Sequence, residues 1–152
     1  MGKRSKKKQL VFMGTDQLGA SVLEYLNQQF SVVLVVTAPP GRIGRGRKRS
    51  SQSPIYKAAL RLKLPVMAPK KLGAGTVKKI NKVKPEFILV YAYGHIIPLK
   101  DLKCSEVINF HPSLLPKLRG PSPIRYAILR GHRETGVSLM KIDQEIDHGP
   151  II

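Results

Sequence analysis

The chain is organised around one run of residues, Ile108-Asn109-Phe110-His111-Pro112-Ser113-Leu114-Leu115-Pro116-Lys117-Leu118-Arg119-Gly120. The run begins as an apolar segment, then enters a loop that contains two prolines and closes on a glycine. Residues two apart on a strand point to the same face, so we expect Asn109 and His111 side by side at the carboxyl end of a buried strand. Ligands of open α/β sheets bind at that end, which makes this position a candidate site.

Apolar and β-branched segments alternate with segments of helical period over the rest of the chain. We predict strands at residues 10–13, 32–36, 64–67, 86–91, 107–110 and 135–142. Between them, helices are expected after a cap at Thr15 or Asp16, after Ser53-Pro54, and over residues 73–83 and 121–129. This alternation predicts an α/β fold: a Rossmann-like, open and mostly parallel sheet with helices on both faces.

Three of these helices have a predicted buried face. In the helix after Ser53-Pro54, the apolar stripe is Ile55, Ala58, Ala59 and Leu62. In the first, the helical period selects Leu18, Val22, Tyr25 and Leu26. In the last, it selects Ile124, Ala127 and Ile128.

Length and charge limit the organisation of the chain. With 152 residues it has the usual size of one domain, and we assign residues 1–8 to a basic, disordered tail and 9–152 to a folded domain. The net charge of +18 favours a nucleic-acid partner. No apolar run approaches the ~20 residues of a membrane span. The N-terminal apolar segment is too short for a signal peptide. We therefore expect a cytoplasmic protein without a membrane partner. Because Cys104 is the only cysteine, we expect neither an intrachain disulfide nor a metal site.

A basic stretch at residues 37–53 contains glycines and prolines and no acidic residue. Its cationic candidates for phosphate contact are Arg42, Arg45, Arg47 and Lys48. Loops longer than about 12 residues in a compact domain are usually functional or disordered. The stretch therefore predicts a loop that orders on binding phosphate, and a mobile solvated loop is the alternative.

The candidate site needs a further polar group, and the acidic cluster Asp143, Glu145 and Asp147 supplies one. An amide, an imidazole and a carboxylate suit acyl transfer to an amine: Asn109 would stabilise the oxyanion, His111 would do so or move a proton, and Asp147 would orient the histidine or accept a proton. A structural alternative stands beside this interpretation, in which Asn109 caps a loop and His111 fills a gap.

The same residues resemble the signature of the folate-dependent formyltransferases, Asn-x-His-x-Ser-Leu-Leu-Pro followed by Asp-x-Gly. The resemblance implies that Asn109, His111 and Asp147 are catalytic and that the formyl donor is 10-formyltetrahydrofolate. It also implies a pterin site at Ser113, Leu114, Leu115, Pro116, Tyr93 and Gly94. Glu145 departs from the family, which has a small residue there.

The basic stretch resembles the Gly-Arg-Gly insertion of the methionyl-tRNA formyltransferases, the branch that formylates initiator methionyl-tRNA in translation initiation. Arg45 matches the arginine of that insertion. The same resemblance implies that the catalytic domain is incomplete at its C-terminal end and that a tRNA-binding β-barrel domain is absent, so an open sheet edge could pair with a second copy. A related formyltransferase or hydrolase with a small substrate, and an inactive RNA-binding fragment, remain alternatives.

Overall fold

The computed structural model describes residues 6–43 and 49–152. Its elements, in chain order, are β1 (Gln9–Gly14), α1 (Gln17–Gln29), β2 (Ser31–Val36), β3 (Gly41–Ile43), β4 (Arg49–Ser51), α2 (Pro54–Arg61), β5 (Val66–Met67), α3 (Ala74–Lys82), β6 (Phe87–Tyr91), the 3-10 turn η2 (Leu99–Asp101), β7 (Glu106–His111), α4 (Pro123–Leu129) and β8 (Ser138–Lys141). Within the described ranges, no helix is long and apolar enough to cross a membrane.

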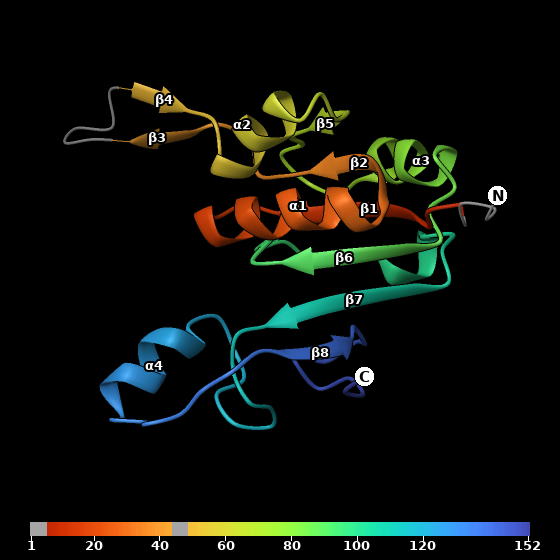
Figure 1. Cartoon of the computed structure of the whole chain (residues 1–152). Helices are drawn as coiled ribbons and strands as arrows, with labels where there is room; N and C mark the ends of the chain where they lie inside the picture. Colours follow the sequence, from red (N-terminus) through yellow and green to blue (C-terminus); the bar gives the residue numbers. More distant parts are fainter. Residues whose placement is uncertain (1–5, 44–48) are drawn as a thin grey trace, which may run out of the picture.

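Six strands form one open sheet in the order β5-β2-β1-β6-β7-β8. Every neighbouring pair is parallel except β7 and β8, which are antiparallel. The predicted open and mostly parallel sheet is therefore confirmed. Figure 1 shows β2, β6 and β7 pointing to the same side of the molecule, so their carboxyl ends share one edge.

Helices cover both faces of the sheet. Side chains along each central strand point alternately to these two faces and therefore contribute to two cores. Leu10 and Phe12 of β1 pack in a cluster with buried residues of α1 and α2. Val11 and Met13 of the same strand pack in a second cluster with Ile80 of α3. All four of these β1 side chains are fully buried, as a central parallel strand requires.

The predicted buried face of α1 is wrong in part. Asp16 caps the helix as expected, with its carboxylate accepting from the amide of Gly19 at 2.7 Å. Leu26 is buried, but Leu18 is 55% and Tyr25 63% exposed. Instead the small residue Gly19 faces the core, where an added Cβ would lie 2.8 Å from a methyl carbon of Ile55. Gly19 thus lets α1 pack close to α2 and to Tyr91 of β6, which a search for large apolar side chains overlooks.

The predicted buried face of α4 is also wrong in part. Of its three predicted core residues, Ala127 is buried, while Ile124 and Ile128 are exposed. The predicted strand at 135–142 is shorter, Ser138–Lys141. The C-terminal residues then pair with that strand, because Ile151 bridges Met140 in antiparallel fashion.

The basic stretch forms more regular structure than the predicted loop. β3 and β4 pair antiparallel, with Gly41 opposite Ser51, and the hairpin projects beyond the sheet (Figure 1). At its base the hydroxyls of Thr37 and Ser53 are 2.7 Å apart. Ser53 also caps α2 and Pro54 occupies the first turn, as predicted. Arg45, Arg47 and Lys48 lie outside the described residues, and Arg42 is described only as backbone in β3.

Candidate functional site

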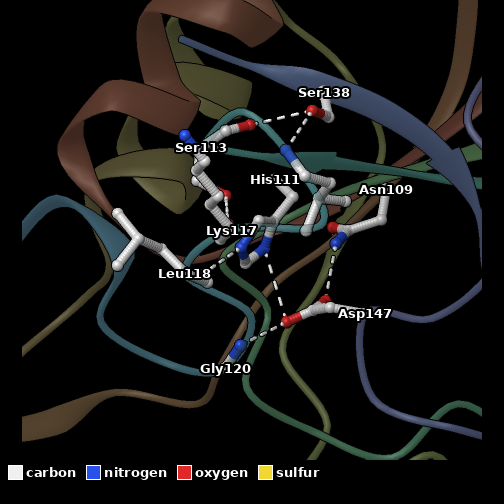
Figure 2. A network of polar contacts seen from close by, with 9 residues as sticks. Asn109, His111, Ser113, Lys117, Leu118, Gly120, Ser138 and Asp147 are labelled. Carbon is white, nitrogen blue, oxygen red and sulfur yellow. Dashed lines mark hydrogen bonds and ion pairs between the residues drawn. The ribbon is translucent and has the colours of Figure 1, made fainter. Parts of the chain in front are cut away.

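Asn109 and His111 lie at the carboxyl end of β7, between β6 and β8. Asn109 is opposite Val90 on β6, and His111 is opposite Ser138 on β8. The two side chains belong to the same face of β7 because they are two residues apart. Figure 2 shows both side chains near the carboxylate of Asp147.

The imidazole of His111 is held at both nitrogens. The residue is 4% exposed, and Nε2 lies 2.9 Å from the carbonyl oxygen of Leu118. A carbonyl oxygen only accepts hydrogen bonds, so Nε2 carries a proton and donates it. Nδ1 then faces Oδ2 of Asp147 at 3.4 Å.

Asp147 connects the two other polar residues. Its Oδ2 also accepts a hydrogen bond from the amide of Gly120 at 2.9 Å, and its Oδ1 lies 3.4 Å from Nδ2 of Asn109. The structure thus brings together Asn109, His111 and Asp147 from segments 38 residues apart. Both 3.4 Å contacts are longer than the ~2.7–2.9 Å of a charge-assisted hydrogen bond, and catalytic hydrogen bonds are often long before a ligand binds.

The turn that carries Asp147 is packed against β8. Asp147 has a left-handed backbone, with φ +50°. Gly149 is buried, and a Cβ added to it would lie 1.9 Å from the carbonyl oxygen of Lys141. A glycine is therefore required two residues after the aspartate. Asp143 and Glu145 both lie near the ring of His148, with Asp143 Oδ2 at 3.4 Å from its Nδ1.

Ser138 fixes the loop that follows the histidine, and sequence reasoning missed it. Its hydroxyl donates to the carbonyl of Ser113 at 2.8 Å and accepts from the amide of Leu115 at 3.1 Å. Ser113 is fully buried, and its own hydroxyl donates to the carbonyl of Lys117 at 2.6 Å. One feature of the sequence could have identified Ser138. Residues of β8 are buried alternately, and Ser138 is a polar residue on the buried face, two residues before the buried Met140.

The predicted pterin residues are not all accessible. Leu114 is exposed and Leu115 and Pro116 follow it in the same loop, whereas the side chain of Tyr93 is 4% exposed and packs in the second core cluster. Burial raises the pKa of Tyr93 to about 12. Gly94 is exposed with φ +74°, so it and the loop backbone remain available to a ligand.

A cavity of about 250 Å³ lies away from this site, beside the amino end of β7, where Cys104 and Glu106 contribute to its lining. Burial raises the pKa of the Cys104 thiol, so the sulfur stays protonated at neutral pH. Among the residues with described positions, no group of three or more His, Cys, Asp or Glu side chains could hold a metal ion.

Solved structures share the fold described above. A glycinamide ribonucleotide transformylase 1 from Geobacillus kaustophilus superposes with a TM-score of 0.74 at 24% identity, over 96% of this chain and 80% of the other. A phosphoribosylglycinamide formyltransferase from Streptococcus pneumoniae superposes with a TM-score of 0.76 at 20% identity, over 96% and 79%. At these identities the comparison shows that the chain has the formyltransferase fold.

Sequence comparison gives the family. The formyl transferase family model matches residues 7–152, and the chain belongs to that family. The methionyl-tRNA formyltransferase of Lactobacillus gasseri is 41% identical over 146 residues, which cover 93% of this chain and 46% of that protein. The enzyme of the same name from Thermus thermophilus is 39% identical over 145 residues, covering 93% and 47%. The chain spans about half the length of these relatives.

Proposed function

We propose that the chain carries the catalytic centre of an enzyme that transfers the formyl group of 10-formyltetrahydrofolate to the free amino group of initiator methionyl-tRNA. The single observation that supports this most is the cluster of Asn109, His111 and Asp147 at the carboxyl edge of the sheet. The relatives named methionyl-tRNA formyltransferase support the choice of acceptor. Such a reaction belongs to translation initiation in the cytoplasm.

In the proposed reaction, the amine of the esterified methionine attacks the formyl carbon and forms a tetrahedral intermediate. The new carbon–nitrogen bond forms, the bond from the formyl carbon to the folate nitrogen breaks, and the proton lost by the amine is delivered to that nitrogen. Asn109 donates to the developing oxyanion by giving up its long contact to Asp147. Asp147, held by the amide of Gly120, accepts the proton from the amine directly or through water.

His111 supports this reaction without itself accepting the proton from the amine. Its Nε2–H is engaged by Leu118, so the ring is held in one orientation, and the edge bearing Nδ1 is the one that faces the reacting groups. When Nδ1 carries a proton, the ring stabilises negative charge on Asp147 or on the oxyanion, and Nδ1 is otherwise placed to move a proton. The folate would lie along the loop from Ser113 to Pro116, whose backbone is fixed from β8 by Ser138.

The basic hairpin supports the tRNA acceptor over a small one. Arg42, Arg45, Arg47 and Lys48 belong to the segment between Thr37 and Ser53. Long-range attraction between such cations and phosphates steers a nucleic acid to the site. The alternative acceptor, a small amine such as those implied by the names of the structural neighbours, would not need this segment.

The test measures formyl transfer from 10-formyltetrahydrofolate to methionyl-tRNA by the chain and by two variants. Asn109→Ala is expected to lower kcat by about 10²–10³-fold, the usual effect of losing one oxyanion donor. Asp147→Asn should lower kcat with little change in folding, because an amide is isosteric and retains one oxygen acceptor. Near-normal turnover in both variants would refute the assigned site. Transfer to a small amine but never to methionyl-tRNA would favour the alternative acceptor.

A further inference from the structure

The loop and helix that follow the site carry a second cluster of cations. Between residues 117 and 133 there are five basic side chains and no acidic one: Lys117, Arg119, Arg125, Arg130 and Arg133. All five are exposed. Among the residues that the structure describes, none of them lies within 4.0 Å of a carboxylate oxygen. Their charge is therefore available to a partner.

Arg119 places this cluster at the rim of the site. Its neighbour Leu118 supplies the carbonyl that holds His111, and its other neighbour Gly120 supplies the amide that holds Asp147. The backbone on both sides of Arg119 is thus fixed to the reacting groups. Figure 2 shows Leu118 and Gly120 flanking the imidazole and the carboxylate.

The cluster also offers a stacking surface. The ring of Tyr126 on α4 is half exposed, and the guanidinium carbon of Arg130 lies 5.5 Å from the ring centroid. Proteins that bind single-stranded nucleic acid use this combination, because bases stack on the exposed aromatic ring while the cations contact the phosphates.

α4 and the basic hairpin lie near opposite ends of the sheet. In Figure 1 the β3–β4 hairpin projects near one end of the sheet and α4 near the other, both on the side to which β2, β6 and β7 point. The carboxyl edge that holds His111 lies between them. A nucleic acid that reached the site would therefore lie between the hairpin and α4.

We propose that Lys117, Arg119, Arg125, Arg130 and Arg133, the α4 basic surface, bind the phosphates of the single-stranded end of an RNA whose terminal group enters the site. The proposal rests on the function proposed above, since an aminoacyl ester is carried at a single-stranded tRNA end. It adds a second RNA-binding surface, separate from the hairpin.

The experiment compares two triple variants of equal charge. Arg119→Ala, Arg125→Ala and Arg130→Ala together remove three cations from the α4 basic surface. As a matched control, Lys78→Ala, Lys79→Ala and Lys82→Ala remove three exposed cations from α3, which Figure 1 shows on the other side of the molecule. Binding of uncharged initiator tRNA and of a single-stranded RNA dodecamer is measured by fluorescence anisotropy over a series of salt concentrations.

The α4 variant should bind both RNAs at least about tenfold more weakly near 0.1 M salt, and the slope of log K against log salt should fall by about 2, since each lost phosphate contact removes ~0.7. The α3 variant should change binding by less than about threefold. Equal losses in both variants would overturn the proposal, because net charge would then explain them. Unchanged binding of the dodecamer by the α4 variant, even with weakened binding of the tRNA, would also overturn it. No folate or formyl transfer enters this assay, so its failure and a failure of the proposed reaction are seen separately.

Discussion

The carbonyl oxygen of Leu118 lies 2.9 Å from Nε2 of His111, and this contact fixes which edge of the imidazole faces Asp147. Leu118 has a left-handed backbone with φ +57°, which turns its carbonyl toward the buried ring. The residue seven positions after the histidine thus sets the orientation of the ring from which the site is built.

The first prediction concerns which nitrogen of His111 donates to Leu118. Because a carbonyl oxygen only accepts hydrogen bonds, the contact at 2.9 Å requires a proton on Nε2. We therefore expect ¹⁵N NMR of the folded chain to show N–H character at Nε2. The same signal should remain in Asp147→Asn, because the carbonyl of Leu118 is unchanged in that variant. A parent spectrum with a proton on Nδ1 and none on Nε2 would contradict the orientation described.

The second prediction concerns Ser138. Ser138→Ala leaves the amide of Leu115 and one acceptor position on Ser113 without a partner in a buried region, which should lower the free energy of unfolding by about 1–3 kcal/mol. Ser138→Thr retains the hydroxyl and should preserve most of the free energy of unfolding. Urea unfolding measures the difference, and formyl transfer by Ser138→Ala should show a raised KM for the folate. Equal stability of the alanine and threonine variants would exclude a structural role for the hydroxyl.

The third prediction compares two glycines. A Cβ at position 149 would overlap the carbonyl oxygen of Lys141, whereas a Cβ at Gly75 in α3 meets nothing within 4 Å. Gly149→Ala should therefore displace the turn of Asp147, lower stability by roughly 2–3 kcal/mol and abolish most formyl transfer. Gly75→Ala should raise stability by about 0.5–1 kcal/mol through helix propensity and leave transfer unchanged. Thermal unfolding and turnover of both variants check the pair.

The main features of the fold could be predicted from local patterns. Central strands such as β1 and β2 are continuous apolar runs because both their faces are buried, and Asp16 and Ser53 mark helix starts by capping chemistry. The burial of α1 could not be predicted in the same way. Gly19 faces the core because it lets the helix approach Ile55, and that contact exists only after α2 has folded against α1.

The site shows the same limit. The i, i+2 spacing of Asn109 and His111 places both on one face of β7, and the sequence contains that information. The contact of Asp147 with the amide of Gly120 depends on the path of two loops, and the link from Ser138 to the loop after His111 depends on the register of β7 and β8. Neither is encoded in a local pattern, so both required the structure.

The fourth prediction concerns Tyr93, whose hydroxyl is buried without a hydrogen-bond partner among the described residues. Tyr93→Phe removes an uncompensated polar group and should raise the free energy of unfolding at neutral pH by about 1 kcal/mol. Burial raises the pKa of Tyr93 from 10.0 to about 12, so between those values the unfolded chain loses the phenolic proton while the folded chain keeps it. The contribution of Tyr93 to stability is therefore intact below pH 10 and falls as the pH rises toward 12.

That fall should be smaller in Tyr93→Phe, which has no phenol to ionise at this position. Urea unfolding of parent and variant at several pH values from 8 to 11.5 measures the difference, and subtraction cancels the titration of other residues, including Tyr91, whose pKa burial also raises. The advantage of the phenylalanine variant should grow with pH above about 10 because only the parent's unfolded state gains ionised Tyr93 there. A constant difference across the range would mean that the hydroxyl reaches solvent or a partner in the folded protein.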